Sequence, residues 1–185
     1  INMSEMAFAL GLQDKMVGVT GISGWHKTSP EFDKARGDIP ELAPKYPSVE
    51  NLVSASADLF FAGWYYGMKP GGDVTPDTLA PFGIKTMILT ESCVHLDKDR
   101  PEASMELLFN DVLRLGKVMQ VEDKAAALVA GWQQQLADYR AAHPALAAEF
   151  ERRASGALPA GFSAAADGYI AACQAAGESP ATRKA

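Results

Sequence analysis

Three short apolar runs, each followed by a loop and then by a helical pattern, constrain the fold of this chain more than any other feature. The runs are KMVGVT at 15–20, DLFFA at 58–62 and KTMIL at 85–89. Strands that alternate with helices usually pair in parallel, because each helix returns the chain to the same end of the sheet. The sequence therefore predicts an α/β fold, a small three-layer lobe built on a parallel sheet.

A long helix is predicted over 121–143. Apolar side chains recur there at steps of three or four residues and should pack on a core: Leu128, Trp132, Leu136 and Tyr139, with Ala125 and Val129 beside them. A proline follows at position 144, where a continuing helix would lose a hydrogen bond. Beyond it no strand pattern remains, and helices are expected at about 145–154 and 163–176, so the C-terminal segment is predicted to be all-helical.

The segment 29–47 contains four prolines, at positions 30, 40, 44 and 47. Proline interrupts helices and strands because it lacks the backbone N–H. We therefore expect a long irregular crossing here and no regular element.

Composition and charge argue against several classes of function. The net charge is -6, whereas a nucleic-acid surface needs clustered Lys and Arg, so no nucleic-acid partner is expected. No apolar run approaches the roughly 20 residues that span a bilayer. Cys93 and Cys173 are far apart and outside any CxxC motif, which argues against a zinc site or a disulfide framework. Because the chain begins with Ile1, we expect a mature form or a fragment, and an exported protein could already have lost its leader.

Four sequence blocks occur in an order that resembles the N-terminal lobe of class III periplasmic substrate-binding proteins, over about residues 1–132. The blocks are EMAFALGLQDKMVGV, SVENLVSASADLFFAGW, VTPDTLAPFGIKTMILTESC and LLFNDVLRLGKVMQVEDKAAALVAGW. Proteins of this family serve ABC importers of siderophores, haem and cobalamin, and a long helix connects their two α/β lobes. The resemblance implies a lobe at 1–120 and a connector helix at 121–143, followed here by a separate helical segment at 144–185.

The resemblance also implies that ligand binds at the loops that follow the strands. Those loops carry Trp25, His26, Trp64, Tyr65, Tyr66, Glu91, Ser92 and His95. Aromatic faces suit a flat macrocycle or a catecholate, so the expected ligand is a ferric siderophore, haem or a cobalamin-like molecule. An aromatic side chain in a loop can equally be a packing cap, and this alternative stays open for each of them. No metal held by the protein and no cofactor is expected, because a siderophore already satisfies its iron.

Glu50 lies at the start of a helix expected over 48–55. The resemblance implies that it is the lobe-surface glutamate with which this family docks onto arginines of the ABC permease. The alternative is a solvated carboxylate that stabilises a helix N-terminus.

The second half resembles a different family, over about 132–185. The blocks WQQQLADYRAAHPALAAEFERRASGALPAGF and ATRKA are similar to the segment of bacterial transketolases that links the diphosphate-binding and pyrimidine-binding domains. This resemblance implies that Arg183 contacts the phosphate of a sugar substrate, and the alternative is a solvated arginine. Transketolases also need a Gly-Asp-Gly type of diphosphate motif, which this sequence lacks, so an inactive fragment is expected.

Motifs for catalysis are missing from the sequence. It contains no G-x-G-x-x-G, P-loop, G-x-S-x-G or H-E-x-x-H string, and no partner that would orient Glu91, Ser92 and His95 as a triad can be named. We therefore expect no enzyme activity and interpret the chain as a fragment or chimera, a periplasmic binding-protein lobe that continues into a transketolase-like segment. Two alternatives stay open, a piece of a cytoplasmic transketolase and a structural module of helices on an α/β unit.

Overall fold

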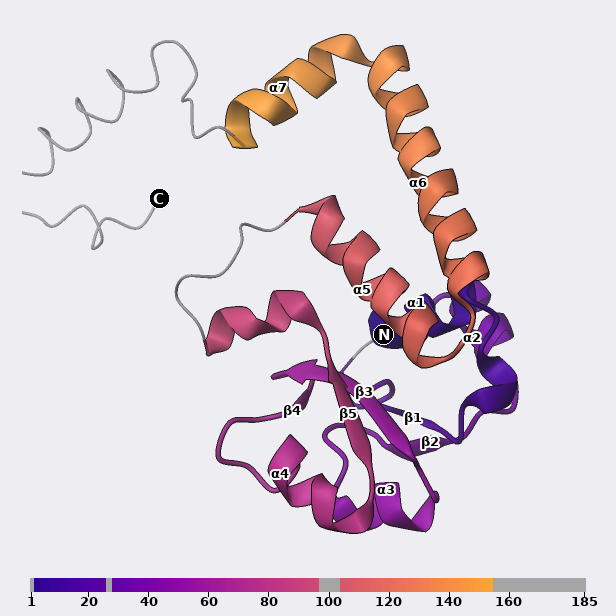
Figure 1. The fold of residues 1–185 in the computed structure, drawn as a ribbon, viewed down its shortest axis with the longest axis vertical. Helices are drawn as coiled ribbons and strands as arrows, with labels where there is room; N and C mark the ends of the chain where they lie inside the picture. Colours follow the sequence, from indigo (N-terminus) through magenta and orange to yellow (C-terminus); the bar gives the residue numbers. More distant parts are fainter. Residues whose placement is uncertain (1, 26–27, 97–103, 155–185) are drawn as a thin grey trace, which may run out of the picture. The chain divides into compact units, whose positions relative to one another are not determined.

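A computed structural model describes residues 2–25, 28–96 and 104–154 (Figure 1). The helices are α1 (Asn2–Ala9), α2 (Pro30–Arg36), α3 (Val49–Ser54), α4 (Pro76–Leu79), α5 (Met105–Val118), α6 (Glu122–Ala142) and α7 (Pro144–Ala154). The strands are β1 (Val19–Thr20), β2 (Glu41–Ala43), β3 (Leu59–Trp64), β4 (Gly67–Met68) and β5 (Lys85–Ile88). The 3₁₀ helices are η1 (Gln13–Lys15), η2 (Ala80–Phe82) and η3 (Thr90–His95).

The strands form two short sheets, and both contain parallel pairs. β1 pairs with β2, and a second sheet has the strand order β4-β3-β5. In the second sheet β3 and β5 run parallel, with Leu59 opposite Lys85 and Ala62 opposite Ile88. Parallel pairing needs a crossover connection, and the segment that contains α4 provides it. The predicted α/β class with parallel strands is therefore confirmed.

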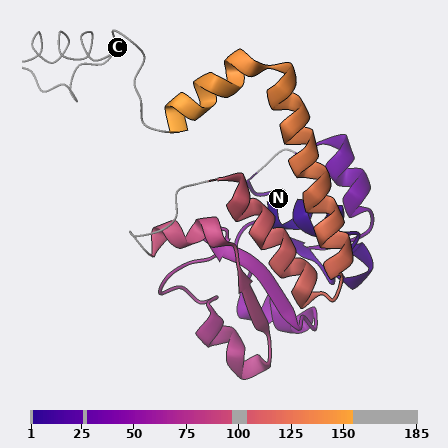
Figure 2. The ribbon, with the colours of Figure 1, turned by 45° about the horizontal axis from the view of Figure 1, so that its top comes forward.

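Helices cover the β3–β5 sheet on both sides. On one side Leu52 of α3 and Leu79 of α4 share a buried cluster with Phe60 and Ala62 of β3. Figures 1 and 2 show α5 on the opposite side of these strands. This three-layer arrangement withdraws both faces of the strands from water, as parallel sheets generally require.

Helices α5 and α6 approach closely where two small residues meet. A β-carbon added to Gly116 of α5 would clash with the Cβ of Ala125 of α6, which is fully buried. The rings of Phe109 on α5 and Trp132 on α6 stack with their centroids 6.4 Å apart. A glycine at position 116 therefore sets the separation of the two helices.

The helix predicted at 121–143 is confirmed as α6. Of its predicted apolar face, Ala125 and Val129 are buried, Leu128 is half-buried, and Trp132 is half-buried against Phe109. Tyr139 departs from the prediction, because it is 55% exposed and its ring contacts His143, with centroids 4.5 Å apart.

The expectation of an irregular crossing at 29–47 is wrong, because its prolines occupy positions that regular elements tolerate. Pro30 is the first residue of α2, where the missing N–H would have no intrahelical partner, and the Ser29 side chain caps that helix. Pro40 and Pro44 flank β2 on either side and do not interrupt it.

The three predicted strands are found with shifted ends. The runs at 58–62 and 85–89 form β3 and β5, with ends that differ by at most two residues. Only the last two residues of the run at 15–20 form β1, which pairs with the three-residue strand β2. Its first residue, Lys15, ends η1.

Glu41 of β2 fastens the loop that follows β1. Its Oε1 atom accepts hydrogen bonds from the amides of Ile22, at 2.9 Å, and Ser23, at 2.8 Å. Partial burial raises the pKa of this carboxyl group, but the amides of Ser23 and Ile22 and the Ser23 hydroxyl lower it by more, so the pKa lies below its usual value. The loop is therefore held by an acceptor that stays charged.

The chain divides into two compact units, Ile1–Trp132 and Gln133–Ala185, with the boundary inside α6. The helix predicted at about 145–154 is confirmed as α7, where Arg152 and Glu149 form an ion pair of 2.6 Å. The helix expected at 163–176 lies outside the described residues, and the division into a lobe, a connector and a helical segment stays a prediction. Among the described helices, none combines the length and apolar character needed to cross a bilayer.

The contact between α5 and α6 predicts a penalty for any side chain at Gly116. We expect Gly116→Ala to lower the free energy of unfolding by about 1–3 kcal/mol, because the added Cβ forces the helices apart. Urea unfolding followed by circular dichroism measures this. Gly131→Ala in α6 is the matched control, because an added Cβ there has no atom within 4 Å, and helix propensity should raise the stability by about 1 kcal/mol. Equal effects of the two substitutions would contradict the proposed packing.

The lowered pKa of Glu41 predicts a pH dependence of stability. Since the folded-state pKa lies below the usual value of 4.5, the carboxylate stabilises the fold above that pH, and this contribution is lost as the pH falls through the folded-state pKa. Glu41→Gln should lower the free energy of unfolding by roughly 1 kcal/mol at pH 7 and by less at acidic pH. Urea unfolding of both proteins across this range measures the difference, and a gap that does not change with pH would show that the charge of Glu41 is irrelevant.

Candidate functional site

The loops after β1 and β2 are held together by their backbones. The amide of Gly21 donates to the Ala43 carbonyl, and that of Gly24 to the Pro44 carbonyl, each at 2.9 Å. A Cβ at Gly24 would clash with the Pro44 carbonyl oxygen, so glycine is needed for this approach. Trp25, which follows Gly24 in the sequence, is thereby brought beside the residues that follow β2.

Trp25, Tyr46 and Tyr65 form a surface group that we call the aromatic cluster. The rings of Trp25 and Tyr46 meet edge to face, with centroids 6.1 Å apart. The Tyr46 hydroxyl donates a hydrogen bond of 3.0 Å to the Tyr65 carbonyl, and thereby joins a loop of the first sheet to a loop of the second. The Nζ atom of Lys45 lies 4.6 Å from the Trp25 ring centroid, a cation–π contact. Trp25, Tyr46 and Tyr65 are 54%, 43% and 44% exposed.

Tyr65 belongs to a tight turn after β3. The backbones of Gly63 and Tyr66 exchange hydrogen bonds of 3.0 and 2.9 Å, and the Tyr65 amide donates to the Met68 carbonyl at 2.7 Å. Tyr65 has a φ of 64°, in the left-handed region that costs a residue with a Cβ about 1–2 kcal/mol. A well-bonded turn therefore presents both Tyr65 and Tyr66 at the surface.

Ser92 fastens the loop after β5 to the end of β3. Its hydroxyl donates to the Leu89 carbonyl at 2.6 Å and accepts from the Trp64 amide at 2.9 Å. Ser92 is fully buried, and Gly63 makes room for it, since a Cβ there would lie 2.9 Å from the Ser92 side chain. Trp64 is half-buried, and Glu91 is exposed. Ser92 thus positions the two loops, while Glu91 faces solvent.

A buried carboxylate fastens the loop after β5 to helix α5. Asp111 accepts hydrogen bonds from the amide of Thr90 at 2.7 Å, from its hydroxyl at 2.5 Å, and from Arg114 at 2.7 Å. Arg114 also donates to the Thr90 hydroxyl at 2.8 Å. Asp111 is 1% exposed, and a buried carboxylate needs such donors because burial disfavours its charge. The sequence analysis did not identify this network.

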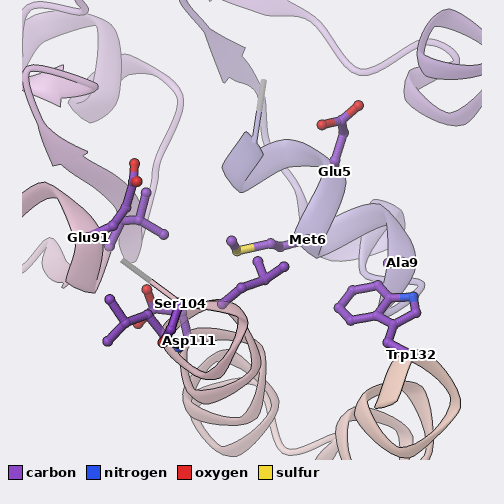
Figure 3. A pocket seen from close by; sticks show the side chains of 10 residues that line it. Glu5, Met6, Ala9, Glu91, Ser104, Asp111 and Trp132 are labelled. Atoms are coloured by element: carbon purple, nitrogen blue, oxygen red, sulfur yellow. Dashed lines mark hydrogen bonds between the residues drawn. The ribbon is translucent and has the colours of Figure 1, made fainter. Parts of the chain in front are cut away.

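A cavity of about 530 Å³ lies between α1, η3 and α5 (Figure 3). Figure 3 shows Met6 pointing into it from α1 and Trp132 lying below Ala9. Glu91 lines the cavity, whereas the residues of the aromatic cluster are not among its described lining residues. The cavity and the aromatic cluster are therefore separate features, and the predicted ligand loops contribute to both.

Glu50 lies in the first turn of α3, a helix that Ser48 caps through a hydrogen bond from the Asn51 amide. A hydrogen bond from the Ser48 side chain, and then one from its own backbone, lowers the pKa of Glu50 below its usual value. The residue is exposed. It therefore presents a carboxylate that stays charged at neutral pH to any cationic partner.

Three residues singled out in the sequence cannot be placed. His26 and Arg183 lie outside the described residues, and so does the side chain of His95, the last residue of η3. Within the described part of the chain, no group of three or more His, Cys, Asp or Glu side chains is arranged to hold a metal ion.

The sequence analysis missed Lys45 and Tyr46. Both follow β2 directly, and loops at strand ends are where ligands are usually met. The strand before them was not recognised, because the prolines around it predict an irregular crossing.

The fold has counterparts among solved structures. A periplasmic binding protein from Veillonella parvula is 26% identical with a TM-score of 0.62, and the similarity covers 75% of this chain and 43% of that one. A periplasmic haem-binding protein from Pseudomonas aeruginosa is 23% identical with a TM-score of 0.54, covering 76% of this chain and 44% of that one. An ABC-type Fe³⁺-hydroxamate transport system from Saccharomonospora viridis is also 23% identical, with a TM-score of 0.55 and coverage of 72% and 45%. The chain thus spans less than half the length of these proteins.

Curated proteins with sequence similarity include transketolase 2 from Vibrio vulnificus, 45% identical over 64 residues. Transketolase 2 from Vibrio parahaemolyticus is likewise 45% identical over 64 residues. The similarity covers 35% of this chain, and the chain spans about 10% of the length of each transketolase.

A family model described as periplasmic binding protein matches residues 2–167 of the 185 in this chain. The match includes both sheets and the aromatic cluster, and it continues into the segment for which a transketolase resemblance was predicted. The solved structures with this fold named above are likewise binding or transport proteins. The chain therefore belongs to the periplasmic binding protein family.

Proposed function

We propose that the chain is the N-terminal lobe of the ligand-binding component of an ABC importer, and that its ligand is a ferric siderophore or a related metal chelate such as haem or a corrinoid. One observation carries the proposal: the aromatic cluster is exposed in loops at the carboxyl ends of parallel strands, where α/β proteins usually bind ligands. Proteins with this fold include one named for haem binding and one for Fe³⁺-hydroxamate transport. The proposal implies a periplasmic location.

The proposed contacts come from exposed side chains on the strand-end loops. The rings of Trp25, Tyr65 and Tyr66 offer flat apolar faces, and Tyr46 contacts the Trp25 ring and the Tyr65 backbone. The proposal also includes Trp64 at the end of β3 and Glu91, which lines the cavity. His26 and the side chain of His95 belong to it as well but lie outside the described part of the chain. Ser92 acts from behind this surface as a positioning residue, because its hydroxyl already has two partners inside the protein.

The proposed activity is binding without chemical change of the ligand. A complete binding protein encloses its ligand between two lobes, and this chain spans 43–45% of the solved relatives. An aromatic contact contributes about 0.5–1.5 kcal/mol beyond the area that it buries, so one lobe supplies only part of the binding free energy. We therefore expect weak affinity for the chain alone.

The binding proposal predicts quenching of tryptophan fluorescence when the full chain is titrated with haem, a ferric hydroxamate chelate and cobalamin. At least one of them should bind, because Trp25 and Trp64 lie in the proposed surface. Tyr65→Ala should weaken that binding about two- to tenfold, since one aromatic contact is lost.

Phe82→Ala provides the matched control for this titration. Phe82 is 57% exposed but lies in η2, before β5 begins, so it is remote from the loops at the carboxyl ends. Its removal should leave the affinity unchanged. Absence of quenching by all three probes, together with no effect of Tyr65→Ala, would contradict the proposed function.

We also propose that Glu50 docks onto an arginine of the ABC permease, because it is exposed in the first turn of α3, within the segment that resembles the docking region of the family. Glu50→Gln in the full chain should weaken binding to permease vesicles about two- to fivefold, as expected for one exposed ion pair. Glu31→Gln is the control, because Glu31 is also exposed in the first turn of a capped helix and has a lowered pKa. Equal effects of the two substitutions would refute a specific role for Glu50.

A second candidate function is favoured by the similarity to transketolase 2 from Vibrio vulnificus over 64 residues. In this alternative the chain is an inactive transketolase piece, and Arg183 contacts a sugar phosphate. Binding of a sugar phosphate by the chain, weakened by Arg183→Gln, would support it. Binding of a metal chelate without binding of a sugar phosphate would support the first function.

A further inference from the structure

We infer that the aromatic cluster selects ligands that carry negative charge at the edge of a flat face, and that Lys45 is the residue that selects them. The inference rests on the proposed function and narrows its ligand class. The ammonium group of Lys45 lies 4.6 Å from the Trp25 ring centroid, so a cation stands at one end of the aromatic cluster.

The charge of Lys45 is available to a ligand. No carboxylate of the described residues forms an ion pair with it. The acidic group of the preceding strand, Glu41, already accepts hydrogen bonds from the amides of Ile22 and Ser23. The net charge of -6 does not cancel this local cation, because charges more than about 8–10 Å apart are largely screened at physiological salt.

The position of Lys45 follows from the contacts around it. The hydrogen bond of 2.9 Å between the Gly24 amide and the Pro44 carbonyl fixes the backbone beside Lys45. The edge-to-face contact between Trp25 and Tyr46 fixes the ring over which the ammonium group lies. In the proposed complex, a flat ligand lies against the aromatic cluster with an acid group at its edge near Lys45.

This arrangement distinguishes two classes of metal chelate. Carboxylate and catecholate oxygens accept charge-assisted hydrogen bonds from an ammonium group, so haem with its propionates and an anionic siderophore both fit. A ferric trihydroxamate without net charge has no comparable partner for Lys45. An exposed charge pair of this kind raises affinity about two- to fivefold, and salt weakens it.

Equilibrium dialysis of the full chain at low and high salt tests the inference with two probes, haem and a ferric trihydroxamate chelate without net charge. In the unchanged chain, haem affinity should fall as salt rises, while affinity for the neutral chelate should stay constant. Lys45→Met should lower haem affinity about two- to fivefold, remove its salt dependence and leave the neutral chelate unaffected. Lys45→Arg should retain the salt dependence.

Lys85→Met is the matched control. Lys85 is exposed at the first residue of β5, at the end of the strand opposite to the candidate site, and its substitution changes the net charge by the same amount. It should leave both affinities unchanged. An equal effect of Lys45→Met and Lys85→Met, or no effect of Lys45→Met on haem, would overturn the inference.

The two proposals fail in different ways. Binding of the neutral chelate alone, weakened by Tyr65→Ala, would overturn the inference and support the proposed function. Binding of neither probe by the unchanged chain would overturn the inference, and absence of cobalamin binding as well would overturn both.

Discussion

Hydrogen bonds between the loop after β5 and the end of β3 set the geometry on which the candidate surface depends. Parallel strands lack the hairpin that aligns antiparallel neighbours, so their carboxyl ends must be aligned by other contacts. Ser92 supplies one, by bridging the Leu89 carbonyl and the Trp64 amide. Asp111 supplies another, because it binds Thr90 at the start of the same loop. The Ser92 contact requires glycine at position 63, since a larger residue there would clash with the Ser92 side chain.

The fold could be predicted from the sequence where local pattern and tertiary structure agree. Alternating strands and helices predicted the parallel pairing of β3 and β5, and apolar periodicity predicted α6. That periodicity did not show how closely α5 approaches α6, because the approach depends on Gly116 of one helix meeting Ala125 of the other. The prediction of an irregular crossing at 29–47 failed for a local reason. The number of prolines does not show whether each one occupies a position that a helix or strand tolerates.

The candidate site was predicted less completely than the fold. Strand ends identified the loops of Trp25, Tyr65 and Glu91, but their arrangement depends on contacts between distant residues. Trp25 and Tyr65 belong to one cluster through Tyr46, which follows a strand that the sequence analysis missed. Ser92 was selected with its neighbours as a ligand contact, yet its hydroxyl has partners inside the protein that no sequence pattern shows.

The hydrogen bond from Tyr46 to the Tyr65 carbonyl has a consequence for the entropy of binding. Ordering a flexible loop around a ligand typically costs about 0.5–1.5 kcal/mol for each side chain that is immobilised. Here the loops are tied to one another before any ligand arrives, by Tyr46 and by the backbone bonds of Gly21 and Gly24. The conformational entropy is therefore lost during folding, and the surface is preorganised. A rigid molecule that matches this surface would keep most of its contact energy as affinity, whereas a flexible molecule would still lose its own freedom.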